Sequence, residues 1–295
     1  MKYTILLFYK YVKIPDPQAV MVFVRGLCTG LGLKGRAIIA EEGVNMTLEG
    51  TSENIQKFID TMKTDPLVKR IGRNVDWKTS EGSGQSFPRL SVKVRKEIVA
   101  LNLGEEDFNP NETTGKYLKP EELNELYEKN DDFVVVDMRN DYEFKVGHFR
   151  NSINPEMENF RDLPKVLPKL ENLKDKKVVT VCTGGVRCEK ASGYLVKKGF
   201  KNVYQLNGGM HRYMEKFGNK DFLGKLYVFD GRVVAGPDGQ HEVVGRCEVC
   251  RHHTERYENC ADPLCHKHIL ICDSCVKSGG VYCVECRDKK LASVV

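Results

Sequence analysis

The sequence predicts a multidomain protein that joins α+β and α/β architecture to a small cysteine-rich module. Three observations support this fold class. Residues 1–100 read as strands and helices in the order β-α-β-β-α-β, residues 117–218 alternate strand and helix, and eight of the 11 cysteines lie between positions 247 and 286. A chain of 295 residues is long enough for two or three domains. The expected divisions are a first domain at 1–101, a linker at 102–116, a second domain at 117–219, and a hairpin plus cysteine-rich module at 220–295.

The first domain is expected to be a ferredoxin-like (acylphosphatase-like) sandwich, because its elements follow that order. A helix over 16–31 has apolar residues at helical spacing, and Thr51 or Ser52 caps a second helix. Gly43 closes a short hairpin between two strands. A loop rich in glycine and serine at 80–86 precedes the last strand. The four expected strands are 3–9, 36–40, 44–48 and 90–99.

The second domain is expected to be an α/β domain built on a parallel sheet. Residues 133–136, 177–181 and 203–206 are mostly apolar runs, as strands buried on both faces are. Pro120 opens a helix at its first turn. Cys182 follows the middle run directly, so it lies at the carboxyl end of a strand, where open α/β sheets place their functional sites.

A short glycine-rich loop connects this strand to a helix over 188–198. Such a loop turns its backbone N–H groups inward at the N-terminus of the helix, which makes a cradle for an anion. The N–H dipoles and Arg187 favour a thiolate at Cys182. The alternative is a structural cysteine buried after a core strand, but glycines and an arginine at fixed offsets favour a nucleophile. The residues of this predicted active-site loop are Cys182, Thr183, Gly184, Gly185, Val186 and Arg187.

The length of the loop indicates which class of reaction it supports. The spacing Cys-x4-Arg resembles that of rhodanese sulfurtransferases, whereas cysteine phosphatases have Cys-x5-Arg, whose wider ring fits a phosphate. The shorter loop therefore favours sulfur chemistry or attack on another small electrophile. Cys188 follows the loop and has two interpretations: it resolves an oxidised or persulfidated Cys182, or it is a small buried residue of the helix. We expect the structural role, because the two ends of a six-residue loop need not face each other.

The cysteine cluster near the C-terminus predicts two structural zinc sites of four thiolates each. Three of its pairs are CxxC knuckles, which let two thiolates from one tight turn reach one tetrahedral ion. Segments this short and polar need the metal to fold, and the chain shows no sign of secretion that would favour disulfides. The order in which the pairs combine stays open. The expected ligands are Cys247, Cys250, Cys260, Cys265, Cys272, Cys275, Cys283 and Cys286, and the histidines available to replace a thiolate are His252, His253, His266 and His268.

The charge distribution permits a nucleic-acid partner. The net charge of +5 is modest, but basic residues concentrate in 66–99, where Trp77 and Phe87 are available for base stacking. The alternative is a solvated basic surface with two core aromatic residues, and the charges alone do not decide between the two. The candidate nucleic-acid-binding residues are Arg89, Lys93 and Arg95.

Nothing in the sequence predicts a membrane partner. No apolar run approaches membrane-spanning length. The apolar start of the chain is too short for a signal peptide and is interrupted by Lys10. We therefore expect a cytoplasmic protein.

Several motifs resemble a known family. Residues 135–144, followed by Gly147 and His148, are similar to the strand and turn early in rhodanese domains, and 206–210 (Leu-Asn-Gly-Gly-Met) resembles the late rhodanese turn. The sequence Cys-Thr-Gly-Gly-Val-Arg-Cys-Glu-Lys-Ala-Ser, between a ferredoxin-like domain and a cysteine cluster, resembles the rhodanese-containing tRNA uridine hydroxylase family. Asn45-Met46-Thr47 departs from the Asn-Gly-Thr of many members, which we interpret as a detail of the hairpin.

The resemblance implies an enzyme that hydroxylates the wobble uridine of tRNA to 5-hydroxyuridine, with Cys182 as the catalytic residue and molecular oxygen as co-substrate. It also implies the anticodon region as partner, and no DNA is expected. Two alternatives stay open: a sulfurtransferase that carries a persulfide on Cys182, and a zinc-containing interaction module whose rhodanese fold is idle. Asp137 and Arg139 are expected to pair near the sheet edge, and Glu143 and His148 are also expected to be structural.

Overall fold

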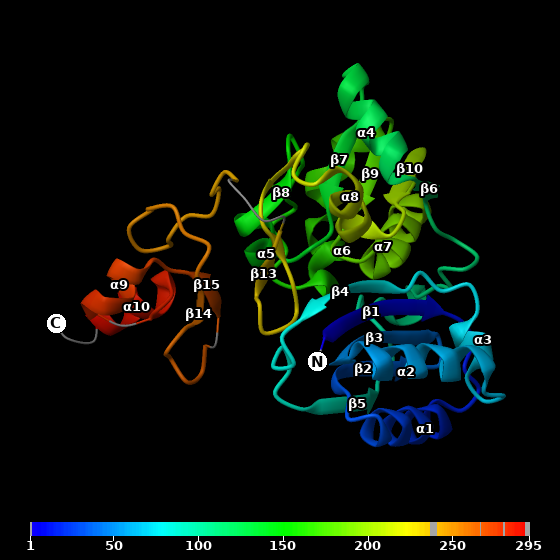
Figure 1. Cartoon of the computed structure of the whole chain (residues 1–295). Coiled ribbons are helices and arrows are strands. Elements are labelled where there is room, and N and C mark those ends of the chain that lie inside the picture. The colour runs from blue at the N-terminus through cyan, green and yellow to red at the C-terminus, as the bar shows by residue number, and fades with distance from the viewer. Residues whose placement is uncertain (1, 237–240, 266, 280, 293–295) are drawn as a thin grey trace.

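A computed structural model describes residues 2–236, 241–265, 267–279 and 281–292, and Figure 1 shows their arrangement. The N-terminal domain, coloured blue to cyan, has its long helices on one side of its sheet and the central domain on the other side. The cysteine-rich module, in orange and red, lies to one side of the central domain. Within the described ranges, no helix is long and apolar enough to cross a membrane.

The N-terminal domain confirms the predicted ferredoxin-like order and adds one strand. Its sheet has the order β4-β1-β3-β2-β5, and neighbours are antiparallel except β2 and β5. Asp16 caps the first helix and Thr51 the second through their side chains. The elements are β1 (Tyr3–Tyr11), α1 (Pro17–Gly30), β2 (Lys34–Ala40), β3 (Gly43–Thr51), α2 (Ser52–Thr64), α3 (Lys69–Gly72), β4 (Lys78–Gly82) and β5 (Leu90–Val94).

The prediction was wrong about the end of this sheet. The segment 80–86 was expected to be a loop, but β4 occupies its first residues and pairs with β1. The expected strand 90–99 ends at Val94 and lies on the far edge, beside β2. β4 is a sheet edge with the polar sequence Lys-Thr-Ser-Glu-Gly, so it lacks the apolar alternation that identifies a half-buried strand.

The alternation along β1 orients the N-terminal domain. Leu6 and Phe8 pack into the core beneath the two long helices. Leu7 and Tyr9 point to the opposite face of the sheet, because successive side chains of a strand alternate. That face meets the central domain, where the Tyr9 hydroxyl donates to Glu189 at 2.9 Å. One face of the sheet is therefore a helix-covered core, and the other contacts the second domain.

The central domain is the predicted parallel α/β domain. Its sheet has the order β6-β10-β9-β7 with every pair parallel. Two apolar clusters fill the space on its two sides. The elements around the sheet are β6 (Lys116–Leu118), α4 (Pro120–Lys129), β7 (Val134–Asp137), α5 (Asp141–Val146), α6 (Leu163–Val166), β9 (Lys177–Val181), α7 (Val186–Lys197), β10 (Asn202–Leu206) and α8 (Gly209–Phe217).

The chain leaves the central domain through a hairpin. β11 (Phe222–Gly224) pairs with β8 (Gly147–Phe149). β12 (Leu226–Tyr227) pairs with β13 (Val234–Ala235), which confirms the hairpin predicted before the cysteine-rich module. The cysteine-rich module follows, with β14 (Tyr257–Asn259), β15 (His268–Leu270), α9 (Asp273–Gly279) and α10 (Val284–Ala292).

Candidate active site

The loop that carries Cys182 is held from behind by the start of α8. The amide of Met210 donates to the Cys182 carbonyl at 2.9 Å, and the amide of His211 donates to the Thr183 carbonyl at 3.0 Å. Gly209 has a φ of +68°, and a Cβ there would meet the Cys182 carbonyl oxygen at 2.6 Å. The Asn-Gly-Gly turn before α8 therefore lets two backbone segments touch, which fixes the loop.

The environment of Cys182 stabilises its thiolate. Burial by itself would raise the pKa, but a hydrogen bond from the Cys188 side chain, the charge of Arg187 and the amides of Cys188 and Gly185 lower the pKa to about 6. The Gly185 amide lies 3.2 Å from the sulfur. The expectation that Cys188 need not face Cys182 was wrong: the helix begins inside the loop, at Val186, so its first turn brings the second thiol back to the first. Burial and the contact with Cys182 raise the pKa of Cys188.

Arg187 is held by Glu143 rather than pointing freely into solvent. The two carboxylate oxygens of Glu143 accept from the two terminal nitrogens of Arg187 at 2.6 and 2.9 Å, and both residues are buried. Burial opposes the charge on the guanidinium, but Glu143 raises the pKa of Arg187, so it stays a cation beside the sulfur. The sequence interpretation of Glu143 as merely structural missed this role. A carboxylate inside a buried helix turn is the signal that points to a cationic partner.

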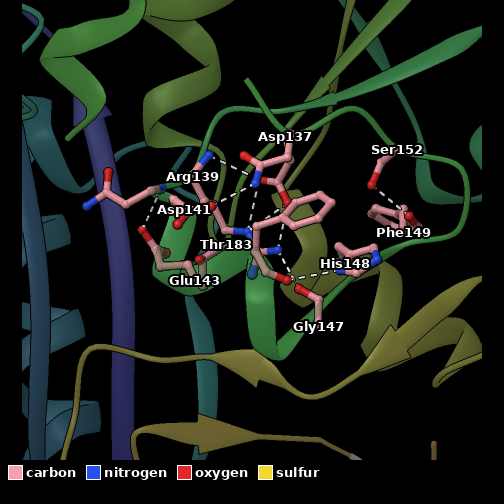
Figure 2. Close-up of polar contacts among 12 residues, drawn as sticks. Asp137, Arg139, Asp141, Glu143, Gly147, His148, Phe149, Ser152 and Thr183 are labelled. Atoms are coloured by element: carbon pink, nitrogen blue, oxygen red, sulfur yellow. Dashed lines mark hydrogen bonds and ion pairs between the residues drawn. The ribbon is translucent and has the colours of Figure 1, made fainter. Parts of the chain in front are cut away.

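A second buried ion pair lies behind the first. Figure 2 shows Asp137 and Arg139 facing each other, with Glu143 and Thr183 nearby. Arg139 donates to Asp137 at 2.9 and 2.6 Å and to the Gly147 carbonyl at 2.6 Å, so the predicted pair is confirmed. His148 stacks on Phe144 with ring centroids 4.0 Å apart, and one of its ring nitrogens lies 2.9 Å from the Phe144 carbonyl. These contacts hold the turn after β7 that carries Glu143.

Cys182 lies at the floor of a cavity of about 420 Å³ between the two domains, here termed the cysteine cavity. The central domain contributes the loop 182–187, and the open face of the N-terminal sheet contributes the opposite wall. The position of Cys182 at the end of a strand was predicted from the sequence, but this wall was not. The residues of the wall are Leu7, Tyr9, Arg36, Ile38, Asn45 and Thr47.

The wall corrects the interpretation of Asn45-Met46-Thr47 as a hairpin detail. Asn45 and Thr47 line the cysteine cavity, whereas Met46 points to the other face and is buried in the core. The Asn45 amide nitrogen donates to the Ile98 carbonyl at 3.2 Å, which fixes the side chain in the wall. The two polar residues of the motif thus belong to the site, and the position that departs from the family pattern belongs to the core.

Helix α7 fastens the N-terminal domain against the loop. Glu189 accepts from the hydroxyls of Tyr9 and Tyr117, each at 2.9 Å. Lys190 has no exposed side-chain area and pairs with Glu97 at 2.6 Å and Glu42 at 2.8 Å. The same turn of helix that follows the active-site loop therefore also holds the second wall of the cavity in place.

The basic segment 66–99 contains both buried and exposed side chains. Trp77 is half-buried against the core of the N-terminal domain, and Phe87 is buried, so the stacking role considered for them stays a prediction. Lys78 is also buried and pairs with Asp76 at 2.6 Å. The three candidate residues are exposed and line a second cavity of about 460 Å³, here termed the basic pocket, which shares Arg36 and Ile38 with the cysteine cavity. The basic residues of this pocket are Arg36, Arg89, Lys93 and Arg95.

The cysteine-rich module brings its eight thiols together as two groups of four. In each group the sulfur atoms lie within 4.8 Å of one another. The pairs combine in crossed order, the first with the third and the second with the fourth. Among the described residues no histidine joins either group, and His266 lies outside the described residues. The groups are Cys247, Cys250, Cys272 and Cys275, and Cys260, Cys265, Cys283 and Cys286. Such all-thiolate groups can each hold a metal ion.

Family models match three consecutive parts of the chain. Residues 3–98 match the UPF0176 acylphosphatase like domain, residues 119–216 the Rhodanese-like domain, and residues 223–287 the Rhodanase C-terminal model. Among solved structures, a rhodanese-related protein from Thermoplasma volcanium is 27% identical with a TM-score of 0.30, and covers 35% of this chain and 93% of its own.

Curated relatives match nearly the whole chain. A protein of Cytophaga hutchinsonii named tRNA uridine(34) hydroxylase is 42% identical over 97% of this chain and 90% of its own length. A protein of the same name from Enterococcus faecalis is 44% identical over 92% of this chain and 85% of its own length.

Proposed function

The chain belongs to the tRNA uridine(34) hydroxylase family, and from this premise we propose that it hydroxylates the wobble uridine of tRNA to 5-hydroxyuridine with Cys182 as the nucleophile. The observation that carries the role of Cys182 is its position: a thiol whose pKa is lowered to about 6 lies at the floor of a cavity between two domains. A cavity of about 420 Å³ falls within the range of roughly 300–1,000 Å³ that small ligands occupy. It therefore offers more space than a persulfide sulfur needs.

A thiolate in this place suits the chemistry of uracil. Carbon C6 of uracil is electrophilic, so a sulfur–carbon bond formed there moves an electron pair toward O4 and makes C5 nucleophilic. Expulsion of the thiolate with loss of the C5 proton afterwards restores the ring double bond and frees Cys182. Both terminal nitrogens of Arg187 donate to Glu143, which holds the guanidinium in place. Arg187 therefore acts as a fixed positive charge near the sulfur and the developing anion.

Molecular oxygen is the proposed oxygen donor. One oxygen atom enters the C5–H bond and the other leaves as water, which consumes two electrons and two protons from a reductant. Incorporation of the heavy oxygen isotope from labelled dioxygen, and not from labelled water, would support this donor.

We further propose that zinc occupies both four-cysteine groups and that its role is structural. Four thiolates at mutual contact distance match the tetrahedral coordination of zinc and leave no open position for a substrate. The anticodon region of tRNA is the proposed partner, and the basic pocket is its proposed binding surface because it shares the lining residues Arg36 and Ile38 with the cysteine cavity. The limits proposed for the domains stay a prediction.

The decisive experiment is nucleoside analysis of tRNA from a deletion strain that carries variants of this gene. The wild-type chain should restore 5-hydroxyuridine, and Cys182→Ser should not, although it should accumulate as a folded protein. Cys188→Ser is the matched variant at the neighbouring thiol: full activity would assign Cys188 a structural role, and lost activity with an unchanged Cys182 titration would support a resolving role. Retained activity of Cys182→Ser would refute the role of the nucleophile. A Cys182 persulfide found in the wild-type protein without any 5-hydroxyuridine would favour the sulfurtransferase alternative.

A further inference from the structure

Phe229 is an exposed aromatic residue inside the cysteine cavity. It keeps 41% of its area exposed and is the one phenylalanine among the exposed large apolar side chains of the described residues. It lines the same cavity as Cys182. The Arg187 guanidinium carbon lies 5.7 Å from its ring centroid, and the Tyr227 ring meets it edge-on at 5.3 Å. The ring contacts Arg187 and Tyr227 but belongs to none of the buried apolar clusters of the described residues.

The loop that carries Phe229 is fixed between two domains. It is the turn between β12 and β13, at the end of the central domain. The Gly231 amide donates to the Ser86 carbonyl of the N-terminal domain at 2.7 Å. Arg232 pairs with Asp230 at 2.6 Å and also donates to the Ser80 hydroxyl at 3.3 Å. The ring is therefore presented to the cavity on a loop whose backbone is held at both sides.

Two arginines on opposite walls accompany the ring. Arg36 comes from β2 and Arg161 from the segment after Phe160, and both are exposed and line the cysteine cavity. Within the described part of the chain neither makes an ion pair with a carboxylate. An aromatic ring and two guanidinium groups without carboxylate partners line one cavity, which matches a nucleotide in single-stranded RNA, with its base on the ring and its flanking phosphates on the arginines.

We propose that Phe229 is the residue on which the target base stacks when it enters the cysteine cavity, with Arg36 and Arg161 at the phosphates on either side. The inference rests on the proposed function and deepens it by naming a positioning residue for the base. A base drawn out of the anticodon loop loses the stacking of its neighbours, and an aromatic ring beside the nucleophile restores it.

Photochemical crosslinking tests the contact directly. An anticodon stem-loop RNA with 5-iodouridine at position 34 is irradiated with the Cys182→Ser protein, in which no covalent attack competes. Light breaks the carbon–iodine bond and joins C5 to an adjacent aromatic ring. Mass spectrometry should place the crosslink on Phe229. A crosslink on another residue, or none at all, would overturn the proposal.

Kinetics of two variants at the same position provide the second test. Phe229→Leu keeps an apolar side chain but removes the aromatic face, and it should raise KM for tRNA by about 5-fold or more, within the roughly 5- to 150-fold range that base–aromatic stacking covers. The value of kcat and the ultraviolet titration of the Cys182 thiolate should stay unchanged, because stacking contributes equally to ground and transition state. Phe229→Tyr should restore KM, and Val22→Ala, an exposed apolar position on α1, should match the wild type. Equal KM values for Phe229→Leu and Phe229→Tyr would contradict a stacking role.

The two tests separate this inference from the proposed function. A crosslink on Phe229 in a protein that forms no 5-hydroxyuridine would leave base stacking intact and refute the reaction. Normal 5-hydroxyuridine formation with an unaffected Phe229→Leu variant would leave the reaction intact and refute base stacking.

Discussion

At the scale of single residues, the charge balance around Cys182 is the feature that matters most. Arg187 supplies a positive charge next to the sulfur, and Glu143 neutralises most of that charge at a distance. A free guanidinium would bind phosphate or substrate indiscriminately, whereas a paired one keeps a fixed place. The Glu143–Arg187 pair therefore places a positive charge beside the thiolate on a guanidinium that is not itself free to bind a phosphate.

The first prediction concerns the pH dependence of Cys182. The thiolate should form with a midpoint near pH 6, where the lowered pKa of the folded protein lies, and should be lost as the pH falls below this value. Activity limited by the thiolate should decline over the same range. The measurement is the ultraviolet absorbance of the thiolate as the difference between the wild type and Cys182→Ser.

Arg187→Met should move this midpoint to higher pH, because it removes a positive charge and leaves the Glu143 carboxylate unbalanced beside the sulfur. The double variant Arg187→Met with Glu143→Gln is the matched control and should show a smaller upward shift. A midpoint that does not move in Arg187→Met would show that the amides and Cys188 alone stabilise the thiolate.

At the scale of elements, α7 has two tasks. Its first turn completes the active-site loop, and its next residues fasten the N-terminal sheet opposite that loop. The helix that follows the Cys182 loop therefore also holds the N-terminal domain in place. A displacement of α7 would therefore move both walls of the cysteine cavity together.

The second prediction tests this fastening. Lys190→Met should lower the free energy of unfolding by about 3–5 kcal/mol, because it leaves the carboxylates of Glu42 and Glu97 without their buried cation. Lys201→Met removes the partner of Asp175 from an exposed pair and should change stability by about 1 kcal/mol or less. Denaturant titration measures both. Equal losses in the two variants would argue against a fastening role of Lys190.

The third prediction concerns β5 and the residues that flank it. Replacing Arg89, Lys93 and Arg95 together by Ala should weaken tRNA binding across all tRNA sequences and reduce the salt slope by about one for each phosphate that is no longer neutralised. The titration of Cys182 should not change, since these residues line the basic pocket and not the cysteine cavity. Arg70→Ala on α3 removes an exposed arginine from outside both cavities and serves as the control. Unchanged affinity of the triple variant would move the tRNA surface elsewhere.

At the scale of the whole molecule, the crossed order of the cysteines joins the C-terminal module into one unit. Each four-cysteine group takes one pair from the first half of the module and one from the second. Neither half can therefore complete a group alone. The small apolar clusters around the thiols are too limited to hold the module without metal.

The fourth prediction follows from this arrangement. Metal analysis should find about two zinc ions per chain, one for each group of four thiolates. Cys272→Ser should lower the content toward one, and it should also expose the second group to chelators, because the two groups are interleaved along the chain. If Cys272→Ser loses one ion but the other group keeps its ion in the presence of a chelator, the two groups fold independently. A folded module without metal would refute the zinc proposal.

The sequence by itself determined the local features of this protein. The elements around Cys182, the six-residue loop, the Asp137–Arg139 pair and the two groups of cysteines all follow from patterns within short segments, because apolar periodicity, glycine positions and ligand spacing act over one or two turns. The edge strand β4 escaped prediction because its sequence carries no apolar alternation.

The residues that share a cavity with Cys182 are brought there by the packing of the domains. Nothing in the local sequence places Asn45 or Phe229 opposite Cys182, since these residues lie in different domains and meet only after the domains have docked. The local sequence likewise did not predict three contacts: the pairing of Arg187 with Glu143, the contact between Cys182 and Cys188, and the crossed order of the cysteines. Such contacts depend on how helices and sheets pack across long separations in the chain, and buried charge pairs and close backbone approaches fix that packing.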